Sequence, residues 1–336
     1  MLNSTPDVNK TQTGVNRINK QPHFIIRKWN EMGNAKGLIT ALLTLVVLFS
    51  FQSEYFLTQN NIISIIDQIT VIGIISLAMT FVILSGGIDL SVGSIVAMSG
   101  VLIAYFISIG MGMYSAALLG VIICAIFGAI AGILITTFHL QPFIVTLGTM
   151  GIATGIAMVL SESSPIPIII NGFNFIGSEK IGIIPIPVII FFLLIVLSFF
   201  TLKKTKFGEY TFAIGGNEEA VRLAGVSVNF YKILIYSISG LAAGFTGYIM
   251  ASKFTSGVPT IGQGYELDAI AAVVIGGTAL SGGIGGIGGT LIGVTIMGVL
   301  NNGLNLMGVS TYWQFIIKGL LVIVAVMIDS YSKRKG

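Results

Sequence analysis

The sequence of 336 residues is poor in charge, because only 9% of its residues are Asp, Glu, Lys or Arg whereas 54% are hydrophobic. Soluble domains carry roughly 25% charged residues, so a soluble globular fold is excluded. Several apolar runs reach about 20 residues, the length of a helix that crosses a hydrocarbon core of about 30 Å. These runs are continuous and lack the alternation of transmembrane β-barrel strands. The sequence therefore predicts an all-α polytopic membrane protein.

Residues for catalysis and cofactor binding are also scarce. The single cysteine, Cys124, excludes an intrachain disulfide, and the two histidines, His23 and His139, have no metal-ligand spacing. There is no P-loop, because the dipeptide Gly-Lys does not occur. A GxGxxG run at 283–288 lacks the flanking strand, helix and acidic residue of a dinucleotide site. We expect a non-catalytic chain that binds no metal and no cofactor.

The few basic residues are concentrated in three places. Fourteen of the 17 precede the first apolar run, fall in one polar loop at 203–232 or end the chain. The positive-inside rule predicts that these three regions are cytoplasmic. The expected organisation is a cytoplasmic tail at 1–37, a transmembrane domain at 38–330 and a cytoplasmic tail at 331–336. Because the apolar region begins late, a cleavable signal peptide is not expected.

The apolar runs and turn signals predict about ten membrane spans. Ten is an even number, which agrees with both termini lying inside the cell. The expected spans are 38–56, 62–84, 90–109, 113–136, 142–160, 183–202, 233–252, 265–281, 287–304 and 311–330.

An internal repeat is visible in two glycine-rich segments. GGIDLSVG at 86–93 and GGTALSGG at 276–283 match at five of eight positions, and each follows an apolar run. Transporters commonly contain internal repeats in which interrupted helices mark the translocation region. Gly86, Gly87 and Asp89 therefore predict a broken helix or a tight turn at membrane depth and are candidates for the translocation pathway.

Small residues recur at the four-residue spacing that lets membrane helices approach closely. We interpret these glycines as helix-packing residues rather than as direct transport residues. The sets are Gly128 and Gly132, Gly151 and Gly155, Gly240 and Gly244, and Gly285, Gly289 and Gly293.

Two ionisable residues fall within expected spans, where an unpaired charge is costly. Asp67 and Lys318 lie at similar depth near the outer face. They are predicted either to form an ion pair or to face a wet cavity separately.

Polar residues also gather at the outer ends of the last spans. Glu266 and Asp268 either cap a helix N-terminus, which favours negative charge, or line a substrate entrance. The run at 301–314 supplies hydrogen-bonding and stacking groups that a neutral sugar needs, although Trp and Tyr are also ordinary interface anchors. Its residues are Asn301, Asn302, Asn305, Tyr312, Trp313 and Gln314.

A charged cluster, GGNEEAVRLAGV, lies in the long inner loop. Asn217 is a favourable N-cap, Glu218 and Glu219 suit a first turn, and Gly225 suits a C-terminal stop. Glu218 and Arg222 have the i, i+4 spacing of an ion pair. The predicted helix of about eight residues is too short to be stable alone. It must pack either on the rim of this chain or on a separate soluble subunit.

Four motifs together resemble the permease of ribose-type monosaccharide ABC importers, over residues from about 40 to the C-terminus. They are GGIDLSVGS (86–94), FGEYTFAIGGNEEAVRLAGV (207–226), GYELDAIAAVVIGGTALSGG (264–283) and NNGLNLMGVSTYWQ (301–314). The resemblance implies the fold of an ABC importer permease in a bacterial cytoplasmic membrane. It also implies a basic residue at the position of Asp67, so a pair between Asp67 and Lys318 would not be a feature of that family.

The implied partners are a second copy of the permease, an extracytoplasmic sugar-binding protein and cytosolic ATPase subunits that use ATP and Mg²⁺. The resemblance makes the charged cluster the coupling helix that docks on the ATPase, formed by Gly216, Asn217, Glu218, Glu219, Ala220, Arg222, Leu223 and Gly225. Ribose is the expected substrate; galactose, xylose, allose and signalling furanoses are alternatives. An ion-coupled secondary transporter and a channel-like protein are the competing classes, and nucleic acid is not an expected partner.

Overall fold

The computed structural model describes residues 35–334, and within them each expected span contains a helix. Residues 1–34 of the expected N-terminal tail, which include His23, and residues 335–336 of the expected C-terminal tail lie outside this range. The helices that correspond to the expected spans are α2 (Ala35–Gln52), α3 (Gln59–Leu84), α4 (Val92–Ser108), α5 (Met113–Thr137), α6 (Pro142–Leu160), α8 (Ile186–Lys204), α11 (Val228–Phe254), α12 (Tyr265–Ile275), α13 (Ile287–Leu306) and α14 (Thr311–Arg334).

The lengths of these helices differ more than the sequence suggests. In the described part of the chain, six helices are long and apolar enough to cross a membrane: α3, α5, α6, α8, α11 and α13. Helices α2, α4 and α14 contribute shorter apolar segments. Helix α12 has 11 residues, which is about 16 Å and roughly half of a hydrocarbon core. The prediction of a span over 265–281 is therefore wrong in its second half, because the helix ends at Gly276 and Gly277, the latter with φ +89°.

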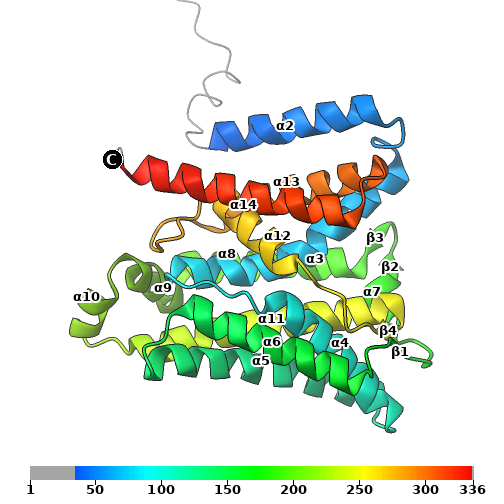
Figure 1. Ribbon diagram of the computed structural model, residues 1–336, viewed down its shortest axis with the longest axis horizontal. Helices are drawn as coiled ribbons and strands as arrows, with labels where there is room; N and C mark the ends of the chain where they lie inside the picture. Colours follow the sequence, from blue (N-terminus) through cyan, green and yellow to red (C-terminus); the bar gives the residue numbers. More distant parts are fainter. Residues whose placement is uncertain (1–34, 335–336) are drawn as a thin grey trace, which may run out of the picture.

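The long helices run side by side, and the connecting segments lie at two ends of the molecule (Figure 1). One end, here called the α10 end, carries α9 (Lys206–Gly216) and α10 (Glu218–Leu223). The first described residues of α2 and the last residues of α14 lie at this same end. The opposite end, here called the strand end, carries α7 (Phe175–Ser178) and the short strands.

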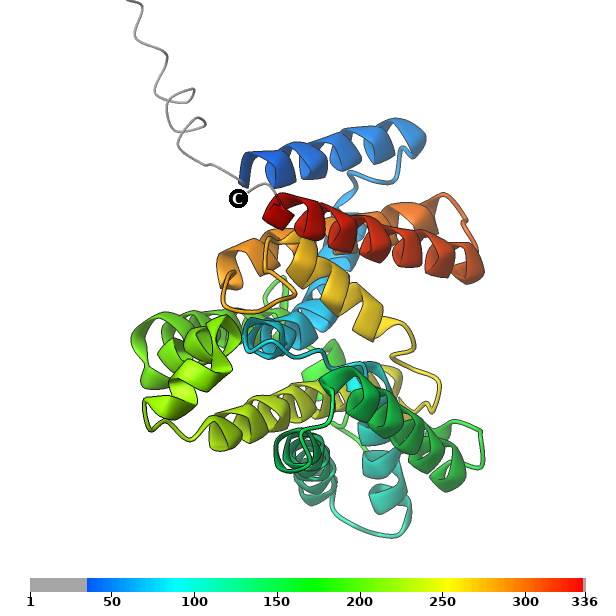
Figure 2. The same cartoon turned by 60° about the vertical axis from the view of Figure 1, so that its left-hand side comes forward.

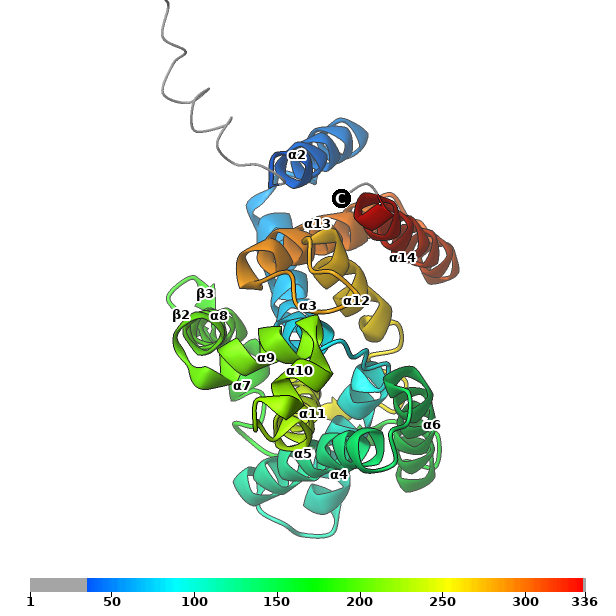
Figure 3. The same cartoon turned by 90° about the vertical axis from the view of Figure 1, so that its left-hand side faces the viewer.

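The helices form two groups joined by α3 (Figures 2 and 3). In one group α11 packs along α5 and α4, and α6 packs on α4. In the other group α13 packs against α12 and α2, and α14 packs on α12. Helix α3 contacts α11 as well as α12 and α13, so its second half is buried from Thr70 to Leu84.

Glycines bring the backbones of α5 and α11 together. A Cβ at Gly128 would collide with the carbonyl of Tyr236, and one at Gly240 would collide with the carbonyl of Cys124. In the second group, Gly289 and Gly293 of α13 lie against the backbone of α12 and its C-cap. The packing role predicted for these glycines, and for the neighbouring Gly132 and Gly244, is confirmed.

The remaining glycines of the four-residue pattern behave differently. Gly285 has φ +144° and lies before α13, so it belongs to a loop and not to a helix surface. A Cβ at Gly151 or Gly155 of α6 would meet nothing within 4 Å. The small-residue face of α6 is therefore not covered by any residue of the part of the chain that the structure describes.

The strand end is built from the long loop at 161–182. Strand β1 (Ile166–Pro167) pairs antiparallel with β4 (Ser256–Gly257), and β2 (Lys180–Ile181) pairs with β3 (Ile184–Pro185). The sequence does not predict these strands. Ser252 of α11 holds the loop, since its Oγ accepts from the Gly177 N–H at 2.8 Å and donates to the Phe173 carbonyl at 2.6 Å.

Candidate functional site

The two copies of the internal repeat lie against each other. Each follows the C-terminus of a helix, one between α3 and α4 and the other between α12 and α13. The N–H of Gly283 donates to the Leu84 carbonyl at 2.9 Å. Gly86 and Gly282, with φ +80° and +84°, approach each other at this contact. The expectation of a broken helix at 86–89 is confirmed, and its partner is the second copy of the repeat.

Helix α9, at the α10 end, reaches this same contact through Gly215. A Cβ on Gly215 of α9 would collide with the Leu84 carbonyl and with the N–H of Gly283. We call the meeting of Leu84, Gly86, Gly215, Gly282 and Gly283 the glycine junction. It joins the end of α9 to the interrupted segments of both repeats without intervening side chains.

Asp89 lies close to the glycine junction and is fully engaged by protein groups. Its carboxylate accepts from the Ser91 N–H at 2.9 Å, the Ser91 hydroxyl at 2.6 Å and the Ser239 hydroxyl at 2.7 Å. Gly87 leaves room for the Tyr236 hydroxyl. These contacts fix the start of α4 against α11, so in this conformation Asp89 presents no free oxygen to a substrate.

The local chemistry predicted for α10 is confirmed. Asn217 Oδ1 accepts from the Ala220 N–H at 3.0 Å, Glu218 pairs with Arg222 at 3.0 Å, and Gly225 has φ +82°. The helix has six residues instead of about eight. The sequence does not predict the preceding helix α9, which begins at the N-cap Thr205 and ends at Gly216.

Helix α10 is anchored to this chain along one side. Val221 is buried with Ile214 and Val228, and Glu218 accepts from Lys232 of α11 at 2.5 Å. Burial raises the pKa of Glu218, but the hydrogen bonds and charges of Lys232 and Arg222 outweigh it and hold that pKa below its usual value of 4.5. Glu218 is therefore ionised at neutral pH and ties α10 to the start of α11.

The other side of α10 is open. Leu223 is 81% exposed, and Glu219, Ala220 and Arg222 are also exposed. Of the two packing alternatives posed by the sequence, the first is found: the rim of this chain holds Val221. Docking of the other face on a separate subunit stays a prediction.

A polar cavity of about 320 Å³ lies between α3, α11, α12, α13 and α14. Two ion pairs line it: Lys253 with Asp67, and Lys318 with Asp268 at 2.8 Å. The predicted ion pair between Asp67 and Lys318 is therefore wrong. Lys253, in the last turn of α11, reaches Asp67, while Lys318 bonds to the buried carboxylate of α12. The alternative expectation, that both residues face a wet cavity separately, describes the arrangement found.

Amides complete the wall of the polar cavity. Asn301 Nδ2 donates to Asp268 Oδ2 at 3.3 Å, and Gln314 Nε2 donates to Asn305 Oδ1 at 2.7 Å. All of these residues line the cavity. Asp268, Asn301 and Asn305, three of the residues predicted for the pathway, are thus brought together.

The other predicted pathway residues lie elsewhere. Asn302 exchanges two hydrogen bonds with Asn61, at 2.8 and 2.9 Å, and does not line the cavity. Glu266 faces α4, where its carboxylate abuts Gly93, and it accepts from the Gly264 N–H. Glu266 therefore caps the N-terminus of α12, whereas Asp268 lines the polar cavity. Tyr312 and Trp313 are exposed and outside the cavity lining.

Sequence reasoning missed Lys253, which lies one residue beyond the expected span 233–252 but belongs to α11 in the structure. The signal that could reveal it is its position: a single lysine in the last turn of a long apolar helix, near the same membrane face as Asp67. A carboxylate within a membrane span is stabilised by a nearby cation, and Lys253 supplies that cation to Asp67.

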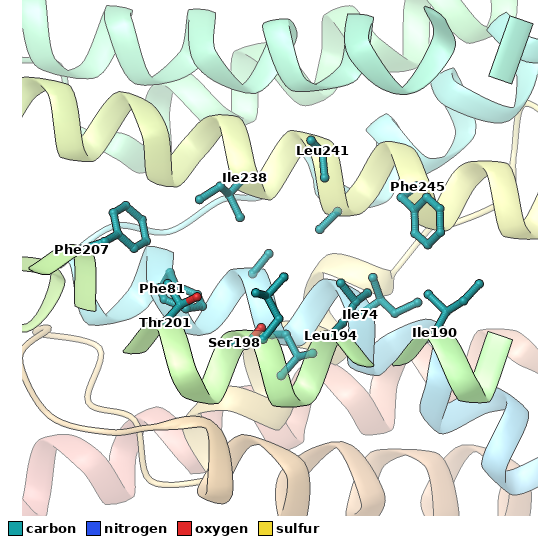
Figure 4. A pocket seen from close by; sticks show the side chains of 14 residues that line it. Ile74, Phe81, Ile190, Leu194, Ser198, Thr201, Phe207, Ile238, Leu241 and Phe245 are labelled. Carbon is teal, nitrogen blue, oxygen red and sulfur yellow. The ribbon is translucent and has the colours of Figure 1, made fainter. Parts of the chain in front are cut away.

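A second cavity is apolar and lies between α3, α8 and α11 (Figure 4). It has a volume of about 400 Å³, and no charged residue lines it. Ile74, Leu194, Leu241 and Phe245 project into it from the three helices. This groove suits a hydrocarbon chain and offers a sugar only the hydroxyls of Ser198 and Thr201. Within residues 35–334, no cluster of His, Cys, Asp and Glu is suited to hold a metal ion.

Interrupted apolar helices, an internal repeat that meets at glycines, and a polar cavity among the helices together define a multi-pass membrane transport protein. Residues 61–326 match the family described as the permease component of branched-chain amino acid transport systems. The chain belongs to this family, and it is a transport component.

Curated relatives are similar over most of the chain. The ribose import permease of Bacillus subtilis is 46% identical over 87% of this chain and 92% of its own length. The ribose import permease of Escherichia coli is 43% identical over 88% and 93%, and the D-allose transport system permease of Escherichia coli is 37% identical over 92% and 94%. No solved structure matches the chain. The resemblance to permeases of sugar importers is confirmed.

Proposed function

We propose that this chain is the membrane permease of an ATP-driven importer that moves ribose into the cytoplasm. The observation that carries the proposal is the identity of 46% and 43% to two ribose import permeases over nearly their whole lengths. The D-allose permease, at 37%, makes allose the second candidate. An extracytoplasmic binding protein delivers the sugar. ATP and Mg²⁺ are bound by a separate ATPase, because this sequence contains no P-loop.

We propose that the α10 end is cytoplasmic and that α10 is the coupling helix. Five basic residues in α8–α11 support this orientation under the positive-inside rule: Lys203, Lys204, Lys206, Arg222 and Lys232. The exposed Leu223 supports docking on the ATPase. Through α9 and Gly215, movement of α10 reaches the glycine junction, where both repeats of the chain meet.

An ion-coupled secondary transporter is less well supported. Such a transporter needs a carboxylate in the membrane that can take up and release its coupling ion. Here Asp89 accepts three hydrogen bonds, and Asp67 and Asp268 are each paired with a lysine. Each of these three carboxylates thus has a structural partner within the chain.

The substrate is tested by uptake into proteoliposomes that contain this chain, its ATPase and its binding protein. We expect labelled ribose to enter, and unlabelled ribose to compete at least tenfold better than allose or galactose. If allose or galactose competes better than unlabelled ribose, that sugar and not ribose is the substrate.

We also propose that two copies of the chain pair through α6. Ile144, Gly148, Gly151, Gly155 and Val159 follow one another at helical spacing, and a Cβ on any of the three glycines would meet nothing within 4 Å. The other small-residue sets on helices are occupied by helices of the same chain, so this face is free for a second copy.

Gly151→Cys is expected to form a disulfide-linked dimer in membranes after mild oxidation, because close helix approach brings the two thiols together. The native Cys124 is buried and does not interfere. Phe192→Cys, exposed on α8, is the matched control and should remain monomeric. Non-reducing electrophoresis measures the fraction of dimer for both variants. Cross-linking at position 192 but not at position 151 would place the interface on α8 instead.

A further inference from the structure

We infer that the apolar groove between α3, α8 and α11 is a binding site for one anionic phospholipid, with an acyl chain in the groove and the phosphate beside Lys204. The chain belongs to a family of membrane transport proteins, so lipid surrounds its outer helices. The inference rests on the proposed function only for the leaflet, since a cytoplasmic α10 end places the lipid in the inner leaflet. The shape of the groove, the order of its polar groups and the charge at its α10 end support this assignment.

The groove forms because α8 and α11 both pack on α3. Helix α7 contacts both of them at the strand end and α9 contacts both at the α10 end, while α3 lines the groove between these ends (Figure 4). The rims are apolar and accessible, because Leu197 of α8 is 59% exposed and Leu241 of α11 is 49% exposed. A slot with hydrocarbon walls and an open side admits a hydrocarbon chain from the surrounding bilayer.

The length of the groove matches one lipid molecule. Ile190 is the lining residue of α8 nearest the strand end, and Lys204 is the last residue of this helix. Between them α8 rises about 21 Å, at about 1.5 Å per residue. One leaflet with its headgroups has the same thickness, roughly half of 40–45 Å.

The polar groups along the groove follow the order found in a phospholipid. Ile190 and Phe245 make one end apolar, and Ser198 and Thr201 supply hydroxyls nearer the α10 end (Figure 4). A hydroxyl can donate to an ester carbonyl. Lys204 follows Thr201 by three positions, so it lies on the same face of α8. Apolar wall, hydroxyls and ammonium thus succeed one another as acyl chain, esters and phosphate do.

Positive charge is in excess at one end of the groove. Within residues 35–334, Lys204 has no ion-pair partner, and Lys203 lies over the ring of Phe199 at 5.0 Å. At the start of α8 the nearby exposed charges are Glu179 and Lys180, which have opposite signs. Basic residues at the end of a membrane helix attract anionic lipids, so the α10 end favours an anionic headgroup.

A lipid in the groove would also contact α9. Phe207 of α9 lines the groove and packs on Phe81 of α3, with the ring centroids 5.7 Å apart. Gly215, near the other end of α9, reaches the glycine junction. The lipid would therefore hold α9 against α3 while α10 moves, and we expect transport to depend on anionic lipid.

The test titrates the full chain, purified in detergent, with phosphatidylglycerol and counts the bound lipid by native mass spectrometry. We expect one phosphatidylglycerol per chain, bound at least tenfold more tightly than the zwitterionic phosphatidylcholine. Inorganic phosphate in excess should not displace the lipid, because the groove holds its acyl chain.

Two variants separate the headgroup contact from the acyl-chain contact. Lys204→Gln should weaken binding of phosphatidylglycerol at least fivefold, whereas Lys180→Gln, at an exposed lysine of the strand end, should leave it unchanged. Leu241→Trp obstructs the groove and should also weaken binding at least fivefold. Its control is Leu193→Trp, the same substitution at an exposed position of α8 outside the groove. Because Lys204 is exposed, Lys204→Gln covers the case in which Leu241→Trp disturbs folding.

Equal binding of the two lipids, or binding that neither Lys204→Gln nor Leu241→Trp weakens, overturns the inference. A bound protein chain that Leu241→Trp displaces, in place of a lipid, overturns it as well.

Uptake of labelled ribose by the complete importer is measured in parallel, in phosphatidylcholine vesicles with and without phosphatidylglycerol. We expect uptake to be at least threefold faster with phosphatidylglycerol, and equal rates would refute the effect on α9. ATP-dependent uptake without selective lipid binding refutes only the lipid site. Selective lipid binding by a chain that takes up no sugar with ATP in either kind of vesicle refutes the proposed function.

Discussion

Gly215→Ala is expected to reduce ATP-dependent uptake at least tenfold, while Gly216→Ala leaves it within about twofold of the unaltered chain. A methyl group on Gly215 would overlap the Leu84 carbonyl and the Gly283 N–H, both of which are backbone and cannot rotate away. It would therefore separate α9 from the glycine junction and break the hydrogen bond between Gly283 and Leu84. The next glycine along the chain has nothing within 4 Å of the same methyl position.

The two substitutions are chemically identical and adjacent in the chain, so they differ only in what the added methyl group contacts. Alanine is the better helix former, by roughly 0.5–1 kcal/mol in a helix interior, so intrinsic propensity cannot explain a loss at either position. Uptake is measured per molecule of permease in the membrane, determined by immunoblot. Equal activity of both variants would show that the close approach at Gly215 is not required for transport.

Leu223→Asp is expected to abolish coupling to the ATPase with little effect on the abundance of the permease. Leu223 is 81% exposed and makes no contact that holds α10 in place, because Val221 and Glu218 provide those contacts. Burying a leucine in a partner stabilises a complex by about 1.5–3 kcal/mol, and 1.4 kcal/mol is tenfold in affinity. Loss of that contact, with a charge added, should weaken ATPase binding at least tenfold.

Co-purification of the ATPase with tagged permease measures this effect directly. Leu223→Met keeps an apolar side chain of similar size and should retain both ATPase binding and uptake. Val221→Asp differs from Leu223→Asp, since it places a charge in the small core under α10 and should lower the amount of folded permease. Normal ATPase binding by Leu223→Asp would place the interface outside this face of α10.

The features predicted well from the sequence are those governed by neighbours in the chain. The cap at Asn217, the pair between Glu218 and Arg222 and the stop at Gly225 all follow from spacing within one turn of helix, and all are present. The apolar runs likewise predict where helices form, because each run must satisfy its own backbone in lipid.

The features that the sequence does not predict depend on residues far apart in the chain. The partner of Asp67 is Lys253, 186 positions away, and only the packing of α11 against α3 decides that it is not Lys318. The sequence predicts a loop where α9 forms, because FGEYTFAIGG combines few long apolar residues with three glycines. Helix α12 ends early because Gly276 must fit against Gly289 of α13, a contact that periodicity alone does not indicate.

The central claim is that ATP hydrolysis in another subunit moves sugar through this chain by way of α10. The most direct test is the initial rate of ribose uptake into vesicles that contain permease, ATPase and binding protein. We expect accumulation with ATP and Mg²⁺, none with a non-hydrolysable analogue, and at least a tenfold loss with Leu223→Asp. Uptake that proceeds without ATP, or that follows an ion gradient and is unaffected by Leu223→Asp, would contradict the account.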